Sequence, residues 1–144
     1  YNVYKELNID IKLEFLLDIA NDVLGSVSID EAKIDEVLTN LVTNARKYGK
    51  ESGKIIISAA DYNKDNFIVS VYDTGIGIPY DQLTTIFDKF SQLDNKKGGS
   101  GLGLAICKDI VKAHGGDIWA ESEVEKWSKF SFTLKKTINV IVQP

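Results

Sequence analysis

Residues 30–49 read DEAKIDEVLTNLVTNARKYG, and this stretch contains the strongest helix signal in the chain. Its apolar residues recur three and four positions apart, the spacing that puts side chains on one face of an α-helix. They are Ile34, Val37, Leu38, Leu41, Val42, Ala45 and Tyr48. Asp30 is a favoured N-cap and Gly49 a favoured helix end. The pattern predicts a helix that begins after Asp30, ends near Gly49 and buries one face.

A polar stripe runs beside this apolar face. Asn40 and Asn44 are four residues apart and Lys47 is three further on, so the three side chains lie on one side of the helix. An amide oxygen suits a hard cation such as Mg²⁺, and a lysine suits phosphate oxygens. Asparagine is a poor residue for a helix interior, so two on one stripe need a reason. A solvated helix face is the alternative interpretation.

A second segment follows a predicted hairpin. Residues 54–60 and 66–72 predict two strands joined by a turn at 63–66, and the loop DTGIGIP occupies 73–79. Its glycines allow the backbone to come close to a ligand, and Asp73 can accept a hydrogen bond from an exocyclic amine. A plain turn after an edge strand is the alternative.

A third segment, GGSGLGLAI at 98–106, runs into a predicted helix over 101–114 that Gly115-Gly116 closes. Free amides at a helix N-terminus attract phosphate. The spacing matches neither a Walker A loop nor a dinucleotide fingerprint. Residues 91–100 are polar and contain glycine, which predicts a mobile loop. A glycine-rich lid without a ligand is the alternative.

The remaining pattern indicates an α+β fold. Strands are expected at 7–15, 26–29, 117–122 and 128–135, and a short helix is expected from Pro79 to Phe87. The tail at 136–144 is an extra strand or a frayed end. The aromatic residues of the segment FDKF at 87–90 are expected in the core. Three helices and five or more strands predict a two-layer α/β sandwich.

Composition excludes several classes of protein. The chain has 17 Lys and Arg against 21 Asp and Glu, a net charge of −4, which argues against nucleic-acid binding. Its apolar runs are far shorter than the roughly 20 residues that span a bilayer, so we expect no membrane contact by this domain. The single cysteine, Cys107, fits a reducing compartment. The 144 residues suit one domain, and a start at Tyr1 without any methionine predicts a fragment of a larger protein.

Four segments in this order and spacing resemble the N, G1, F and G2 boxes of the histidine-kinase catalytic domain. They are 40–48, 73–79, 87–90 and 98–106. That family belongs to the superfamily of gyrase, heat-shock chaperones, mismatch-repair proteins and histidine kinases. The resemblance covers a core of about 7–135 and implies the Bergerat fold, with a mixed sheet of about five strands covered on one face by three helices. It also implies ATP as the nucleotide and Mg²⁺ as cofactor.

The resemblance implies a role for each matching residue. Asn44 would ligate Mg²⁺, and Asn40 and Lys47 would be catalytic, meeting the phosphates or the waters of the metal. Tyr48 would cover the adenine or ribose, and Asp73 would accept from the 6-amino group of adenine. The other nucleotide-binding residues would be Gly75, Gly77 and Ile78 around the base and Ser100, Gly101, Leu102, Gly103 and Leu104 at the phosphates. Phe87 and Phe90 would anchor a lid formed by 91–100.

Two departures from the family pattern stand out. The family often has Gly-Lys-Gly-Ser/Thr in its last hairpin, where this chain has Glu125-Lys126-Trp127-Ser128. The geometry of that hairpin, and any water-mediated role of Ser128 near adenine, are therefore open. Family lids often carry an arginine near the γ-phosphate, whereas this one offers Lys96 and Lys97.

The implied function is transfer of the γ-phosphoryl group of Mg-ATP to a histidine on a separate dimerisation domain of the same parent, a two-component sensor. The only histidine here, His114, ends a helix, which predicts a capping or core role. A response regulator, a homodimeric parent and a cytoplasmic location, including the cytoplasmic part of a membrane-anchored sensor, are also implied.

Other members of the superfamily provide the alternatives. An ATPase clamp would carry a glutamate as general base four residues before Asn44, where this chain has Asn40, so the kinase is favoured. A non-catalytic nucleotide-binding module and a serine kinase are the remaining alternatives.

Overall fold

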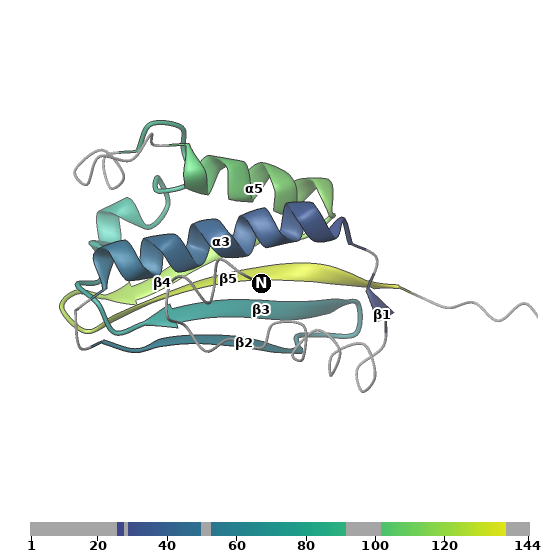
Figure 1. The fold of residues 1–144 in the computed structure, drawn as a ribbon, viewed down its shortest axis with the longest axis horizontal. Helices are drawn as coiled ribbons and strands as arrows, with labels where there is room; N and C mark the ends of the chain where they lie inside the picture. Colours follow the sequence, from purple (N-terminus) through teal and green to yellow (C-terminus); the bar gives the residue numbers. More distant parts are fainter. Residues whose placement is uncertain (1–25, 28, 50–52, 92–101, 138–144) are drawn as a thin grey trace, which may run out of the picture.

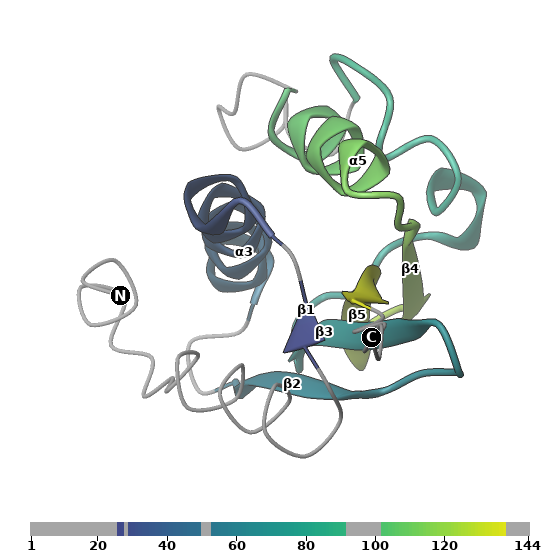
Figure 2. The same ribbon diagram turned by 90° about the vertical axis from the view of Figure 1, so that its right-hand side faces the viewer.

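Two α-helices lie on one face of an antiparallel sheet (Figures 1 and 2). The computed structural model describes residues 26–27, 29–49, 53–91 and 102–137. Within these ranges the α+β sandwich predicted from the sequence is confirmed. Three predictions fall outside them: the strand at 7–15, the lid from Gln92 to Ser100, and the tail after Thr137.

Helix α3 (Glu31–Tyr48) has both of its predicted ends. The Asp30 side chain caps it by accepting a hydrogen bond from the Lys33 amide, and Gly49 is the C-cap. The predicted apolar stripe is buried from Ile34 to Ala45, while Tyr48 at its end is half-buried. The stripe packs on the sheet, so the neighbouring asparagines lie at the margin of the core.

The sheet is built from two hairpins. β2 (Ile55–Asp61) pairs with β3 (Asn66–Asp73), and β4 (Ile118–Glu123) pairs with β5 (Trp127–Thr137). β3 and β5 pair in the middle, and β1 (Ser26–Val27) pairs with the far end of β5. Every pairing among the described strands is antiparallel, so the parallel pairing that a mixed sheet needs does not occur within them. β5 also runs two residues into the predicted tail.

The core lies between the sheet and the helices. Because side chains alternate along a strand, every second residue of β3 and β5 faces the helices. These residues are Phe67, Val69, Val71 and Asp73 on β3, opposite Leu134, Phe132, Phe130 and Ser128 on β5. Asp73 and Ser128 are thus a polar pair at the end of an otherwise apolar ladder.

Helix α5 (Gly103–Ala113) lies beside α3 and buries Leu104, Cys107, Ile110 and Val111 (Figure 2). It begins two residues later and ends one residue earlier than predicted, with His114 as the C-cap before Gly115 at a φ of 76°. No helix among the described residues is both long and apolar enough to cross a bilayer.

The helix predicted from Pro79 to Phe87 is wrong in kind. The segment contains a 3-10 helix of three residues, Tyr80–Gln82, followed by turns. The Gln82 carbonyl accepts from the Thr85 amide at 3.1 Å, the Ile86 amide at 3.0 Å and the Thr85 hydroxyl at 3.3 Å, so the segment has single turns and no continuous α-helix. Phe87 enters the core as expected, against Phe130. Phe90 does not, because the backbone turns there at a φ of 61° and its side chain is 65% exposed.

Candidate nucleotide-binding site

The predicted site residues come from three elements that meet at one end of the sandwich. These are the second half of α3, the loop after β3 and the first turn of α5. On α3, the side chains of Asn40, Asn44, Lys47 and Tyr48 are all half-buried. The polar stripe is therefore a margin between core and solvent, the position from which side chains can contact a ligand.

Asp73 is the buried carboxylate of the site. It is the last residue of β3, is 3% exposed, and accepts a hydrogen bond from the Gly75 backbone amide. Burial raises the pKa of Asp73 from 3.8 to about 6, and the bond from Gly75 only partly opposes that shift. No cation forms an ion pair with it among the described residues. A buried acceptor without a counter-charge suits a neutral donor such as an aromatic amine.

The loop after Asp73 is fixed to the end of α3. Gly49 and Gly75 form a β-bridge, and the Ile76 amide donates to the Tyr48 carbonyl at 3.2 Å. A Cβ on Gly75 would lie 2.5 Å from the Tyr48 oxygen and 2.6 Å from Oδ1 of Asp73. Only glycine fits there. The loop 73–78, which is predicted to contact adenine, therefore lies directly against the end of α3, the helix whose polar stripe is predicted to contact the phosphates.

The other side of the loop is fixed to the β4–β5 turn. Gly77 has a φ of 75°, and a Cβ on it would lie 2.6 Å from the Glu123 carbonyl oxygen. The Glu125 amide donates to the Ile76 carbonyl at 2.8 Å. The Ile78 amide donates to Oγ of Ser122 at 2.7 Å. The loop is therefore held on both flanks by backbone hydrogen bonds, and both glycines are required by close approach.

Ser122 is a residue that sequence reasoning missed. It pairs with Ser128 across β4 and β5, and Ser128 pairs with Asp73 across β5 and β3. The three polar residues thus form a row on the helix-facing side of the sheet. Alternation from Phe130 and Phe132 would have placed Ser128 on that face. Ser122 could be found only after the β4–β5 register was known.

The hairpin forms despite its missing glycines. Glu125 occupies the turn at a φ of 66°, a conformation that glycine adopts more easily. Trp127 lies on the opposite face of the sheet from Ser128 and stacks on Tyr72, with ring centroids 6.1 Å apart. Its bulk therefore lies away from the predicted nucleotide site.

The start of α5 lies against α3. The side-chain amide of Asn40 donates to the Gly103 carbonyl at 3.4 Å. Leu104 is buried in the core at 1% exposed, so only its backbone could reach a phosphate. Leu102 is the N-cap of α5 and, being apolar, cannot cap the helix with its side chain. Ser100 and Gly101 lie outside the described residues.

Lys47 and Tyr48 form a pair at the end of α3. The ammonium of Lys47 lies 5.7 Å from the centre of the Tyr48 ring, within cation–π range. Such a contact restrains a flexible lysine near the position where the polar stripe ends. This arrangement is compatible with the predicted roles of Lys47 at a phosphate and of Tyr48 at the base or ribose.

The donor set suits Mg²⁺ only if the nucleotide supplies most ligands. No cluster of three or more His, Cys, Asp or Glu residues exists in the part of the chain that the structure describes. Mg²⁺ commonly keeps several waters and takes few protein ligands beside substrate phosphates. The half-buried amide of Asn44, on the same helix side as Asn40 and Lys47, fits that requirement.

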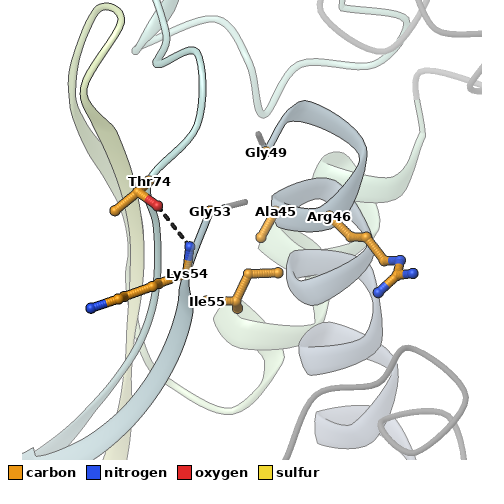
Figure 3. A pocket seen from close by; sticks show the side chains of 7 residues that line it. All are labelled: Ala45, Arg46, Gly49, Gly53, Lys54, Ile55 and Thr74. Carbon is orange, nitrogen blue, oxygen red and sulfur yellow. Dashed lines mark hydrogen bonds between the residues drawn. The ribbon is translucent and has the colours of Figure 1, made fainter. Parts of the chain in front are cut away.

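A separate cavity of about 250 Å³ lies between the end of α3 and the start of β2. It is lined by Ala45, Arg46, Gly49, Gly53, Lys54, Ile55 and Thr74, none of which is a predicted site residue. Figure 3 shows the charged ends of Arg46 and Lys54 pointing away from each other. The Lys54 amide donates to the Thr74 hydroxyl at 2.7 Å. The cavity has no converging charges, so we assign no ligand to it.

Comparison with known proteins defines the class of this domain. Residues 29–138 match the family described as histidine kinase-, DNA gyrase B- and HSP90-like ATPase. The chain belongs to this family.

Its relatives are sensor kinases. It is 46% identical over 114 residues to the sensor histidine kinase WalK of Bacillus subtilis, covering 75% of this chain and 18% of WalK. It is 40% identical over 133 residues to the adaptive-response sensory kinase SasA of Crocosphaera subtropica, covering 91% of this chain and 35% of SasA. The chain therefore spans a minor part of the length of these relatives.

Solved structures of similar fold include the catalytic domain of a histidine kinase. The nucleotide-free catalytic domain of the histidine kinase ThkA superposes with a TM-score of 0.68 at 38% identity, over 78% of this chain and 73% of that one. Full-length ShkA in complex with AMPPNP superposes with a TM-score of 0.71 at 25% identity, over 94% of this chain and 34% of ShkA. ThkA has also been solved in complex with the response regulator protein TrrA.

Proposed function

We propose that this domain binds Mg-ATP and transfers its γ-phosphoryl group to a histidine on a separate dimerisation domain of the same parent protein. The nucleotide would lie between α3, the loop 73–78 and the start of α5. The adenine would meet Asp73, and the phosphates would meet the polar stripe of α3. ShkA, which binds the ATP analogue AMPPNP in its crystal structure, is a fold neighbour that supports this proposal.

Asp73 is the observation that carries the proposal. A buried carboxylate that forms no ion pair with the described part of the chain destabilises the fold, and such groups cluster at functional sites. It lies beside a loop that is held close by two required glycines, so a flat base can approach the backbone there. An exocyclic amino group would supply a further donor to this carboxylate, beside the Gly75 amide.

The phosphate end rests on the chemistry of α3. When bound, Mg²⁺ would neutralise charge that develops on the phosphate oxygens. The Asn44 amide oxygen would hold it, and Lys47 would bind a phosphate oxygen. Asn40 would orient the phosphates or the waters of the metal while also joining α3 to α5 through Gly103. These groups position and stabilise charge, which is most of what phosphoryl transfer asks of a protein.

The acceptor is proposed to be a histidine outside this chain. An amide at Asn40 cannot remove a proton from water, whereas the ATPase clamps need a base at that position. The nucleophile and its base would therefore come from the dimerisation domain. The proposed parent is a homodimer in the cytoplasm that passes its phosphoryl group to a response regulator. The ThkA–TrrA complex supports a partner of that kind.

Calorimetry and phosphoryl transfer test the proposal together. We expect the chain to bind ADP and ATP in the presence of Mg²⁺. We also expect it to label a separately supplied helical hairpin from the parent on its histidine, giving an acid-labile phosphate. The hairpin with its histidine replaced by glutamine is the control. Absence of nucleotide binding by the folded chain would overturn the proposal, and acid-stable label would indicate a serine or threonine kinase instead.

A further inference from the structure

The β4–β5 turn contacts the loop 73–78, which is predicted to bind adenine, although the turn lacks the glycines that are common in the family. Two backbone groups of the loop form hydrogen bonds with this hairpin. The Ile76 carbonyl accepts from the Glu125 amide, and the Ile78 amide donates to the Ser122 hydroxyl. Gly77 between them leaves no room for a side chain against Glu123 and Val124. The position of the loop is thus set by the hairpin on one flank and by α3 on the other.

The Ser122 hydroxyl lies at the centre of this contact. Its hydroxyl accepts from the Ile78 amide at 2.7 Å and donates to the Trp127 carbonyl at 2.7 Å. It also lies 3.3 Å from the Ser128 hydroxyl. A hydroxyl has one proton and two lone pairs, so these contacts use the donor and leave acceptor capacity for Ile78 and Ser128.

We propose that Ser122 is a positioning residue for nucleotide selection, which holds the Ile78 backbone at the distance from Asp73 that an adenine requires. This inference rests on the proposed nucleotide-binding function. Ser122, Ser128 and Asp73 lie opposite one another on adjacent strands, which are about 5 Å apart. The Ser122 hydroxyl, which holds the Ile78 amide, therefore lies in the same row as Asp73, the proposed acceptor of the adenine amino group. Ser122 acts through Ile78 and makes no contact with the reacting phosphate.

The consequence differs from a loss of stability alone. If the hydroxyl is removed, the Ile78 amide loses its acceptor and the loop can shift relative to Asp73. ADP, which presents the 6-amino group, should then lose affinity. IDP, which has a 6-oxo group in its place, should lose less. The ratio of the two dissociation constants therefore reports the geometry of the base site, and global stability does not change it.

Calorimetric titration with ADP and IDP tests this inference. In Ser122→Ala we expect ADP to bind about threefold to tenfold more weakly, the range of one lost hydrogen bond, and the preference for ADP over IDP to fall by a similar factor. Ser122→Thr keeps the hydroxyl and should restore the preference. Ser122→Cys, with a weaker acceptor of similar size, should lie between them and remains informative if Ser122→Ala fails to fold.

Ser131→Ala is the matched control. Ser131 is another β-strand serine, fully buried where Ser122 is half-buried, and its hydroxyl bonds to that of Ser70 at 2.9 Å on the opposite face of the sheet. It should lose stability without a change in the ADP-to-IDP ratio. If the unmodified chain prefers ADP over IDP and the ratio of the two dissociation constants is unchanged in both Ser122→Ala and Ser122→Cys, the role of Ser122 is overturned but the proposed function is not. If the unmodified chain is folded and binds neither nucleotide, the proposed function and this inference are both overturned.

Discussion

His114 joins the two helices of the outer layer: its Nε2 accepts a hydrogen bond of 3.1 Å from the backbone amide of Asp30, 84 residues earlier in the chain. Its Nδ1 lies 2.8 Å from the Ile110 carbonyl, a distance at which an Nδ1 proton is donated to that oxygen while Nε2 accepts. The ring therefore connects the C-terminus of α5 to the N-cap of α3. The capping role predicted from the sequence is confirmed, and the link between the helices is new.

We expect His114→Ala to destabilise the fold by about 1–2 kcal/mol, because it leaves the Asp30 amide without its acceptor and removes the contact with Ile110. Urea unfolding at neutral pH measures this cost. Lys108→Ala, a change on the exposed side of the same helix, is the control and should be nearly neutral. Equal stability of the two variants would contradict the role of the bridge.

The buried carboxyl of Asp73 predicts an unusual pH dependence of stability. Its pKa is raised from 3.8 to about 6, so its stabilising contribution is complete below 3.8 and is lost as the pH rises through 6. Asp73→Asn carries no charge at any pH. We expect this variant to exceed the parent in unfolding free energy by on the order of 2–3 kcal/mol at pH 7.5, with the gap closing toward pH 4. A gap that does not change with pH would refute this assignment.

The sequence segments predicted that α3, the loop after β3 and the start of α5 lie close together, and the structure brings these three elements into contact. The roles of their residues in binding a nucleotide stay predictions. The 3-10 segment at Tyr80–Gln82 was not predictable, because apolar spacing over so few residues does not separate an α-helix from a 3-10 turn. Ser122 was not predictable either. Its importance comes from the register of β4 on β5 and from contact with Ile78, which is 44 residues away.

Asn44 predicts how nucleotide affinity depends on Mg²⁺. If its amide oxygen holds the metal, Asn44→Ala should flatten the Mg²⁺ dependence of ATP binding more than it weakens metal-free binding. Calorimetry over a Mg²⁺ series, with a chelator at the low end, measures both. Thr43→Ala, on the exposed side of α3, should behave like the parent chain. The metal ligand must be sought elsewhere if Asn44→Ala titrates like the control.

Glu125 predicts a stabilising substitution. It holds a φ of 66°, which costs roughly 1 kcal/mol for a residue with a Cβ and little for glycine. We expect Glu125→Gly to raise the unfolding free energy by about 0.5–1 kcal/mol. Glu125→Ala separates this backbone effect from the loss of the glutamate side chain, because it keeps the Cβ. A similar change in stability in both variants would mean that φ is not the cause.

The chain alone is expected neither to phosphorylate itself nor to hydrolyse ATP at a useful rate. α5 has 11 residues, so His114 lies about 16 Å from the turn at Gly103 where the phosphates are proposed to bind. Both of its ring nitrogens are already engaged, by Ile110 and Asp30. For hydrolysis, water needs a base near the γ-phosphate, and Asn40 offers a neutral amide whose NH₂ donates to Gly103.

Incubation with γ-labelled ATP measures both reactions of the isolated chain. Acid treatment separates phosphohistidine, which is labile, from phosphoserine, which is stable, and released phosphate reports turnover. Label that is acid-labile and disappears in His114→Ala would show that the ring is reachable after all. Turnover of about 1 s⁻¹ or more would place the domain in the common range for enzymes and favour an ATPase clamp. Asn40→Glu, which restores the carboxylate of the clamps at that position, should raise hydrolysis above the parent chain if the missing base is what limits it.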